Sequence, residues 1–518
     1  MALDSVHPRY ADQAPDWIKL RDFAKGERAV KAKTTTYLPA TKGMLLDGMG
    51  QTATNKSQLG QEVYDAYLLR AVFPEYMMDA LQIFMGMLHN KSPVIELPKD
   101  MESLRNNATE IGEPLELLLQ RINLEQLITG RVGLLGDLPK KPDPKNPMPF
   151  LALYVAEAIR NWDNDAIGDE RAELNLVVLD ESGYSRNAEF EWQVVKKYRV
   201  LMIDPEDGRV YKCGEFSDQK GDLNFDPTQM RVPKIRGKQL ESIPFIFVNS
   251  KDITPDPDEP PLIGLARLCG AIYRGEADYR QNLFMQGQDT LVIIGSRSKG
   301  FADPLGGTEE PLRTGAGSRI ELEPEPGADA KYVGVNSQGL SEQRQALEND
   351  RKRAESRSGQ LIDASQGDKE SGTALKTRVG AQTATLNQIA KTGALALELM
   401  LKKLAEWMGS NPDEVKVIPN LEFADFQMSG QDLVNLMTAK RTQGAPLSLE
   451  SIHRLMVQGN LTQIDFVKEQ ELIKGEEEFV SPEAKLAKET AELAAKAKVQ
   501  PLGPGPAPKD PQNPAQTD

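Results

Sequence analysis

The sequence predicts an α+β fold that is mainly α-helical, and three observations carry this prediction. Apolar residues recur at three- or four-residue steps through much of the chain, which is the period of an amphipathic helix. Between about 175 and 248 the pattern changes to alternating, β-branched and aromatic runs, which are typical of antiparallel strands. From Ser341 to Gly409 a charged helical run, a polar hinge and a long amphipathic segment follow one another, which predicts helix, loop, helix.

Length and composition restrict the class of protein. A chain of 518 residues with 39% hydrophobic residues is long enough for two to four modules. No run approaches the roughly 18 apolar residues that span a bilayer, and the first residues resemble no signal peptide. Only Cys213 and Cys269 are present, which excludes a disulfide framework. A net charge of −15 argues against a static grip on DNA, but not against a surface that DNA slides past.

The first 150 residues are expected to be mostly helical. A basic stretch between Trp17 and Tyr37 could touch nucleic acid, although a solvated helix face is the favoured interpretation. The run from 62 to 93 predicts a core helix interrupted at Pro74. Residues 115–137 predict a helix followed by a strand, and the proline-rich tract 138–150 predicts a loop.

A helix is predicted from Leu262 to Gln288, with Glu276 four residues before Arg280 as an ion pair. The insertion after it contains three short strand patterns, TLVIIGS, SRIELEPE and AKYVGVN. A second long helix is predicted from Thr373 to Met408. It contains Gly380 and Gly393, each costing about 1 kcal/mol against alanine, so we expect a bend at one of them.

Short motifs in a fixed order give the chain a family resemblance. They are Pro15-Asp16-Trp17 with RDFAKGERAVKA and YLP, then YDAYLLRAVF, GRVGLLGD, IPFIFVN, PPLIGLARL, ADYRQ and SGTALK. Over about residues 7–475 the sequence resembles the portal proteins of tailed bacteriophages, in the siphophage-type branch. The resemblance implies a portal-like fold with wing, stem, clip and crown modules. It also implies a ring, usually of twelve copies, at one capsid vertex.

The resemblance implies the following map of modules. Residues 1–260 form the N-terminal wing region, helical in 1–150 and β-rich in 151–260. The stem helices are 261–290 and 341–358, with the clip at 291–340 between them and the tunnel loop at 359–372 after them. The long wing helix and wing return occupy 373–440, the crown and C-terminal helices 441–500, and a disordered tail 501–518.

The implied partners are further copies of the chain, double-stranded DNA passing through the channel, the large terminase subunit and a head-tail adaptor. The major capsid protein is a further partner, with scaffolding protein as an additional candidate. The implied location is the portal vertex of the virion, after assembly in the host cytoplasm. No cofactor, metal or membrane is implied, and the role is structural rather than enzymatic.

Three groups of site residues follow from this map. In the stem, cations interleaved with acids are expected to face the bore; the open alternative is salt bridges to solvent or to neighbours. These cations are Arg344, Arg351, Lys352, Arg353 and Arg357. The tunnel loop is expected to touch DNA through Gln366, Gly367, Asp368, Lys369, Glu370 and Ser371; the open alternative is an ordinary hinge between two helices. The clip is expected to dock partners through Arg297, Lys299, Arg313 and Arg319; a compatible alternative is that it joins neighbouring clips.

Enzymatic interpretations have little support. The stretch before Lys56-Ser57 lacks the glycine of a phosphate-binding loop, and the match of Ser296 and Lys299 to S-x-x-K lacks its partner motifs. His7, His89 and His453 are far apart in the chain. A metal-dependent nuclease and a non-viral oligomeric scaffold remain as alternatives. Near the C-terminus two short helices are predicted, capped by Ser448 and by Thr462.

Overall fold

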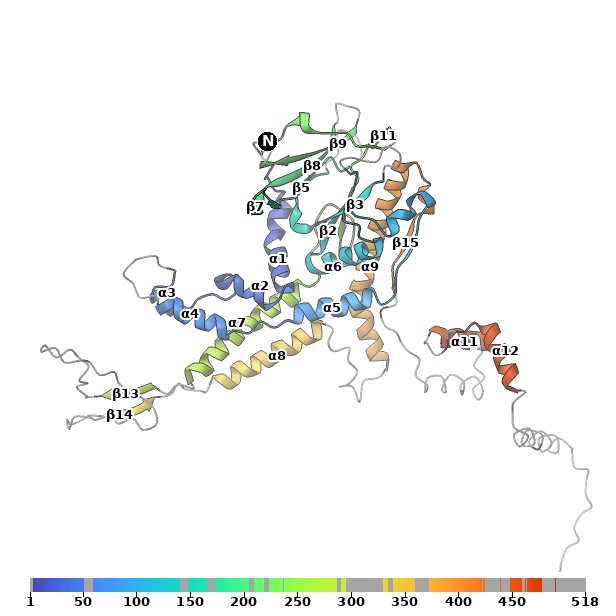
Figure 1. Cartoon of the computed structure of the whole chain (residues 1–518). Coiled ribbons are helices and arrows are strands. Elements are labelled where there is room, and N and C mark those ends of the chain that lie inside the picture. Colours follow the sequence, from blue (N-terminus) through green and yellow to red (C-terminus); the bar gives the residue numbers. More distant parts are fainter. Residues whose placement is uncertain are drawn as a thin grey trace, which may run out of the picture. The chain divides into compact units, whose positions relative to one another are not determined.

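The computed structural model of the chain describes residues 3–50, 59–139, 148–164, 173–204, 209–218, 223–235, 237–286, 290–294, 329–333, 339–358, 372–421, 423, 438, 448–458, 462, 464–477 and 490. The chain divides into two compact units, Met1–Phe423 and Ala424–Asp518. Helices and antiparallel sheets both occur in the first unit (Figure 1), so the predicted α+β class is confirmed.

The N-terminal part is helical, as predicted. Its helices are α1 (Pro8–Ala24), α2 (Glu27–Ala32), α3 (Lys42–Leu46), α4 (Leu59–Arg70) and α5 (Tyr76–Leu88). The break between α4 and α5 includes Pro74, which lacks an N–H and cannot continue a helix. The buried aromatic side chains of Phe23 and Phe73 meet edge to face there, with centroids 4.9 Å apart.

Helix α6 (Leu115–Thr129) leads directly into strand β2 (Arg131–Asp137), also as predicted. Gly130 joins them with φ +72°, and an added Cβ would lie 3.0 Å from the Pro260 backbone, so only glycine fits this turn. Strand β2 is the centre of a sheet with the order β12-β2-β3. Its neighbours are β12 (Phe245–Asn249) and β3 (Phe150–Val155), both antiparallel.

A four-stranded antiparallel sheet forms the rest of the predicted β-rich module. Its order is β4 (Ile159–Asp163), β5 (Leu176–Asp180), β8 (Lys197–Asp204) and β9 (Val210–Ser217). Between β5 and β8 the chain forms a separate hairpin of β6 (Gly183–Arg186) and β7 (Trp192–Val195). A smaller pair joins β10 (Lys234–Ile235) to β11 (Lys238–Gln239).

The second half of the first unit contains three long helices. They are α7 (Ile263–Gln286), α8 (Leu340–Ser358) and α9 (Gly372–Met408), and each lies within a few residues of its predicted range. Between α7 and α8, β13 (Thr290–Ile294) pairs with β14 (Asp329–Val333), as two of the three insertion patterns predict. The third pattern, SRIELEPE, lies outside the described residues. After α9, strand β15 (Lys416–Ile418) pairs with β1 (Val94–Glu96).

Helix α9 contributes to two hydrophobic cores. Leu386 and Ile389 are buried with α1, α4, α5 and α7, whereas Leu397 and Met400 are buried with α6 and β2. Gly393 lies between these groups, where an added Cβ would lie 2.4 Å from Oδ1 of Asn123. Gly393 lowers the helix propensity of α9, but its lack of a side chain permits close packing against α6.

The second unit contains α11 (Leu449–Gln458) and α12 (Phe466–Glu477). Ser448 Oγ accepts a hydrogen bond from Ser451 N at 2.9 Å, which confirms the first predicted cap. The second prediction is wrong: Asp465, next to the first helical residue, accepts from Val467 N. Thr462 lies too early in the chain and accepts from Ile464 N instead.

Candidate functional site

Helices α7 and α8, the predicted stem pair, run antiparallel and in close contact (Figure 1). Near one end, an added Cβ on Gly264 would lie 2.5 Å from Arg357 Nη1. Three helical turns along α7, an added Cβ on Gly275 would lie 3.1 Å from Leu347 Cδ2. The small residues share one face of α7, and they let α8 approach.

Glu276 is the centre of the polar contacts between these helices. Its two carboxylate oxygens accept from Arg280 Nε on the same helix and from Arg351 Nη2 on α8, each at 2.7 Å. The predicted Glu276–Arg280 pair is thus confirmed. Only 6% of the Glu276 side chain is exposed, so its charge needs both cations. Arg351 is therefore a structural cation within the chain.

The remaining predicted stem cations are exposed. Arg344 pairs with Glu348 one turn away at 2.9 Å, and Arg353 pairs with Asp350 at 3.4 Å. Lys352 is exposed. Because Leu347 and Ala354 face the core, helical geometry places Lys352 and Arg353 toward the opposite side of α8.

The N-terminal helices hold this pair in place. Tyr67 OH on α4 donates to Asp278 Oδ1 on α7 at 2.6 Å. Burial and this hydrogen bond to Asp278 raise the pKa of Tyr67. Arg70 donates to Gln281 at 2.5 Å and stacks over the Phe284 ring at 4.0 Å.

Two groups of predicted site residues lie outside the described residues and stay predictions. They are the tunnel-loop residues Gln366, Gly367, Asp368, Lys369, Glu370 and Ser371, and the clip residues Arg297, Lys299, Arg313 and Arg319. The elements that flank them are described. Hairpin β13–β14 stands at the predicted clip, and the predicted tunnel loop lies between the end of α8 and the start of α9.

The basic stretch near the N-terminus has a structural component. Arg21 on α1 donates to Glu157 Oε1 at 2.6 Å and to Glu125 Oε2 at 2.8 Å. Burial opposes this guanidinium charge, but hydrogen bonds to the two carboxylates outweigh it and raise its pKa. Arg21 is therefore neither a solvated cation nor a free contact for nucleic acid.

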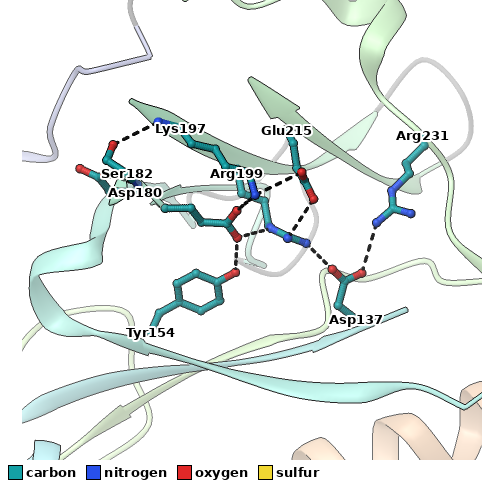
Figure 2. Close-up of polar contacts among 9 residues, drawn as sticks. Asp137, Tyr154, Asp180, Ser182, Lys197, Arg199, Glu215 and Arg231 are labelled. Carbon is teal, nitrogen blue, oxygen red and sulfur yellow. Dashed lines mark hydrogen bonds and ion pairs between the residues drawn. The ribbon is translucent and has the colours of Figure 1, made fainter. Parts of the chain in front are cut away.

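A buried ion network joins the two larger sheets, and sequence reasoning did not find it (Figure 2). Arg199 on β8 contacts Asp137 at the end of β2, Glu181 at 2.5 Å and Glu215 at 3.0 Å. Lys197 also contacts Glu181 and Glu215. Burial acts against the Glu181 carboxylate, but Arg199 and Lys197 outweigh it and lower its pKa.

This network has the features of a structural joint. Arg231 completes three cations against three carboxylates, and Tyr154 OH donates to Glu181 at 2.7 Å. The one feature that could have indicated this network is the pairing of β8 with β9, which places Arg199 opposite Glu215. That signal needs a strand register, which spacing along the chain does not supply.

The described residues contain neither a metal-binding cluster nor a membrane-spanning helix. Among them, no group of three or more His, Cys, Asp or Glu side chains is placed to hold a metal ion. The described helices include none that combines the length and the apolar character needed to cross a membrane.

Comparison with known proteins gives a partial family match. Residues 261–408 match the family described as "Domain of unknown function (DUF4055)", a range that spans α7 to α9. No curated protein matches the chain.

The similar solved structures include two with low scores. One is "Neck of native GTA particle computed with C12 symmetry", with 12% identity, TM-score 0.35, and coverage of 74% of this chain and 89% of that chain. The other is "Neck of empty GTA particle computed with C6 symmetry", with 13% identity, TM-score 0.35, and coverage of 80% and 97%. The chain is therefore similar to a family of unknown function over its central helices.

Proposed function

We propose that this chain is a portal-type subunit. Copies of it assemble into a ring, usually of twelve, at one vertex of a capsid, and double-stranded DNA enters and leaves through the central channel. The proposal rests on the ordered motifs between about residues 7 and 475. It is supported by the order of the elements α7, β13–β14, α8 and α9.

The observation that carries the proposal is that the cations on α8 fall into two groups, one bound within the chain and one exposed. Arg351 is bound to the buried Glu276, whereas Lys352 and Arg353 are exposed on the other side of the helix. DNA carries about one charge per 1.7 Å of its axis, so a continuous positive wall would hold it. A few exposed cations in a chain of net charge −15 would guide a moving duplex and release it.

Electron microscopy of the purified full chain tests the ring. We expect rings with an axial hole wide enough for a DNA duplex. A compact monomer or a closed assembly without a hole would contradict the proposal, and would favour the non-viral scaffold.

The channel is tested with matched stem variants in a packaging assay. Lys352→Gln with Arg353→Gln should leave ring assembly intact and reduce the amount of DNA packaged or retained. Arg105→Gln is the single-site control, because Arg105 pairs with Glu102 and lies outside the predicted stem. Unchanged packaging by the double variant would assign these cations to solvent-facing salt bridges.

The predicted tunnel loop and the predicted clip are each tested with a variant. Deletion of residues 366–370 should leave rings intact and impair genome filling, because this polar loop would contact the DNA. Replacement of Arg297, Lys299, Arg313 and Arg319 by glutamine should weaken binding of the large terminase subunit or the head-tail adaptor. Normal filling, or unchanged binding, would remove the corresponding role.

A further inference from the structure

Residues 3–7 form a strap against the four-stranded sheet, just before the start of α1 (Figure 1). Leu3 is buried in an apolar cluster with side chains from β5, β8 and β9, which are Val178, Tyr198, Val200 and Phe216. At the other end of the strap, His7 N donates to Arg160 O on β4 at 2.9 Å. The strap therefore covers part of the apolar surface of this sheet.

The His7 imidazole joins the strap both to α1 and to the sheet. Its Nδ1 accepts a hydrogen bond from Arg9 N at 3.2 Å, so His7 is the N-cap residue of α1. Its ring stacks on the indole of Trp162 on β4, with centroids 4.0 Å apart and an interplanar angle of 18°. The cap requires a neutral imidazole, because an imidazolium donates from both ring nitrogens and accepts at neither.

The Trp162 ring already holds a permanent cation. The guanidinium carbon of Arg131, the first residue of β2, lies 4.4 Å from this ring and 4.5 Å from the ring of Phe247. Arg131 is fully buried, and its Nη1 donates to Pro255 O at 2.5 Å. Burial lowers the pKa of Arg131 to about 9, so it stays charged at neutral and mildly acidic pH. Arg131 therefore takes up the attraction of this indole for a cation, and an imidazolium would be a second positive charge beside it.

Charged groups of both signs act on His7. Burial has the largest effect and lowers the pKa of His7, and the charges of Arg131 and Arg9 act in the same direction. Asp256, in the loop after β12, and Asp163, at the end of β4, act in the opposite direction. The result is a pKa below the ordinary value of 6.5. The closed strap therefore favours the neutral imidazole that the cap requires.

Helix α1 has anchors of its own that do not involve His7. Tyr10 OH donates to Glu157 O at 3.0 Å and accepts from Arg160 Nη1 at 2.9 Å. One to two turns further along, the side chain of Trp17 is fully buried. A change at His7 can therefore free the strap while α1 stays in place.

We propose that residues 3–7 are a pH-sensitive strap, which opens from the four-stranded sheet when His7 takes up a proton. Protonation removes the acceptor for Arg9 N and places a second cation beside Trp162 and Arg131. The open strap binds a proton more readily than the closed one, so opening is favoured as the pH falls below about 6.5. The inference does not depend on the portal-type ring, because all of these contacts lie within one chain.

Hydrogen exchange of the full chain, measured by mass spectrometry at pH 7.5 and pH 5.5 with labelling times scaled for the intrinsic rates, tests the strap. The N–H groups of His7 and Arg9 are bonded in the closed strap. Their protection should fall by about fivefold at pH 5.5, the effect of losing an N-cap acceptor, while residues 17–23 of α1 keep theirs. Equal protection at both pH values would overturn the proposal, and so would an equal loss throughout α1.

Two substitutions of His7 separate the proton from the cap. Asparagine is a good N-cap residue and does not titrate, so His7→Asn should keep the strap protected at both pH values. Alanine cannot cap, so His7→Ala should lose about fivefold in protection already at pH 7.5. A pH response that persists in His7→Asn, or full protection in His7→Ala, would remove His7 as the switch.

His89→Gln is the matched control for a second partly buried histidine. His89 contacts Asn123 on α6, so this variant should show the same loss of strap protection at pH 5.5 as the unaltered chain. A strap that stays protected at pH 5.5 in His89→Gln would assign the response to His89 and overturn the proposal.

Discussion

The carboxylate of Glu276 on α7 lies 2.7 Å from the guanidinium of Arg351 on α8, although the two residues are separated by the whole predicted clip. Among the described residues, this ion pair is the principal charged link between α7 and α8. It also distinguishes a structural arginine from its exposed neighbours on the same helix.

Replacing Arg351 by glutamine should destabilise the chain by about 1–3 kcal/mol, because a mostly buried carboxylate loses one of its two cations. Arg353→Gln is the matched control and should change stability by less than about 0.5 kcal/mol, since 73% of the Arg353 side chain is exposed. Urea unfolding of both variants measures the difference. Equal effects would contradict the assigned role of Glu276.

Arg199→Met should be more damaging, with a loss of about 3–5 kcal/mol, because three carboxylates would share fewer cations in a buried site. Asp137 is the most affected, since only 3% of its side chain is exposed. The exposed pair of Arg209 with Glu173 provides a control in Arg209→Met. Thermal unfolding compares them, and a stable Arg199→Met variant would show that the joint between the sheets does not depend on this network.

Gly393→Ala should destabilise the chain although alanine favours helices by about 1 kcal/mol. The new methyl group would meet Asn123 Oδ1 at 2.4 Å and Gln126 Oε1 at 2.9 Å. Gly86→Ala in α5 is the control with open space around the new Cβ, and it should stabilise by about 0.5–1 kcal/mol. Opposite signs in calorimetry are expected; two stabilised variants would show that α6 and α9 can move apart at little cost.

Stability should fall as the pH decreases below about 6.5 in part through His89. Burial lowers the pKa of this imidazole in the folded chain, so the unfolded state binds the proton first and is favoured as the pH falls. The penalty starts near the unfolded pKa and grows until the folded pKa is reached. His89→Gln should reduce the drop in melting temperature between pH 7.5 and pH 5.5; an unchanged drop would assign it to other groups.

The sequence predicted the long helices well because their periodicity extends over many turns. Helix α9 was expected from Thr373 and begins at Gly372, and both end at Met408. The Glu276–Arg280 pair was visible because it spans a single helical turn. Arg351 could not be assigned beforehand, since its partner depends on how α8 is aligned with α7.

The sequence did not predict the short strands or the contacts between distant residues, for a similar reason. Strands β1 and β15 have three residues each, too few for a periodic signal, and each is defined by its partner. The position of β12 at the end of its sheet could not be predicted either, because it depends on the order of strands in the sheet. The cap of α12 was misplaced because Thr462 and Asp465 are both good capping residues, and only the start of the helix decides between them.

The pairing of β1 with β15 has a consequence for synthesis on the ribosome. Ile95 cannot pair with Val417 until about 320 more residues have been translated. At about 5–20 residues per second this takes some tens of seconds. Nascent chains therefore carry an unfinished N-terminal unit through most of translation. Completion of this unit during folding is in this way delayed until residue 417 has left the ribosome.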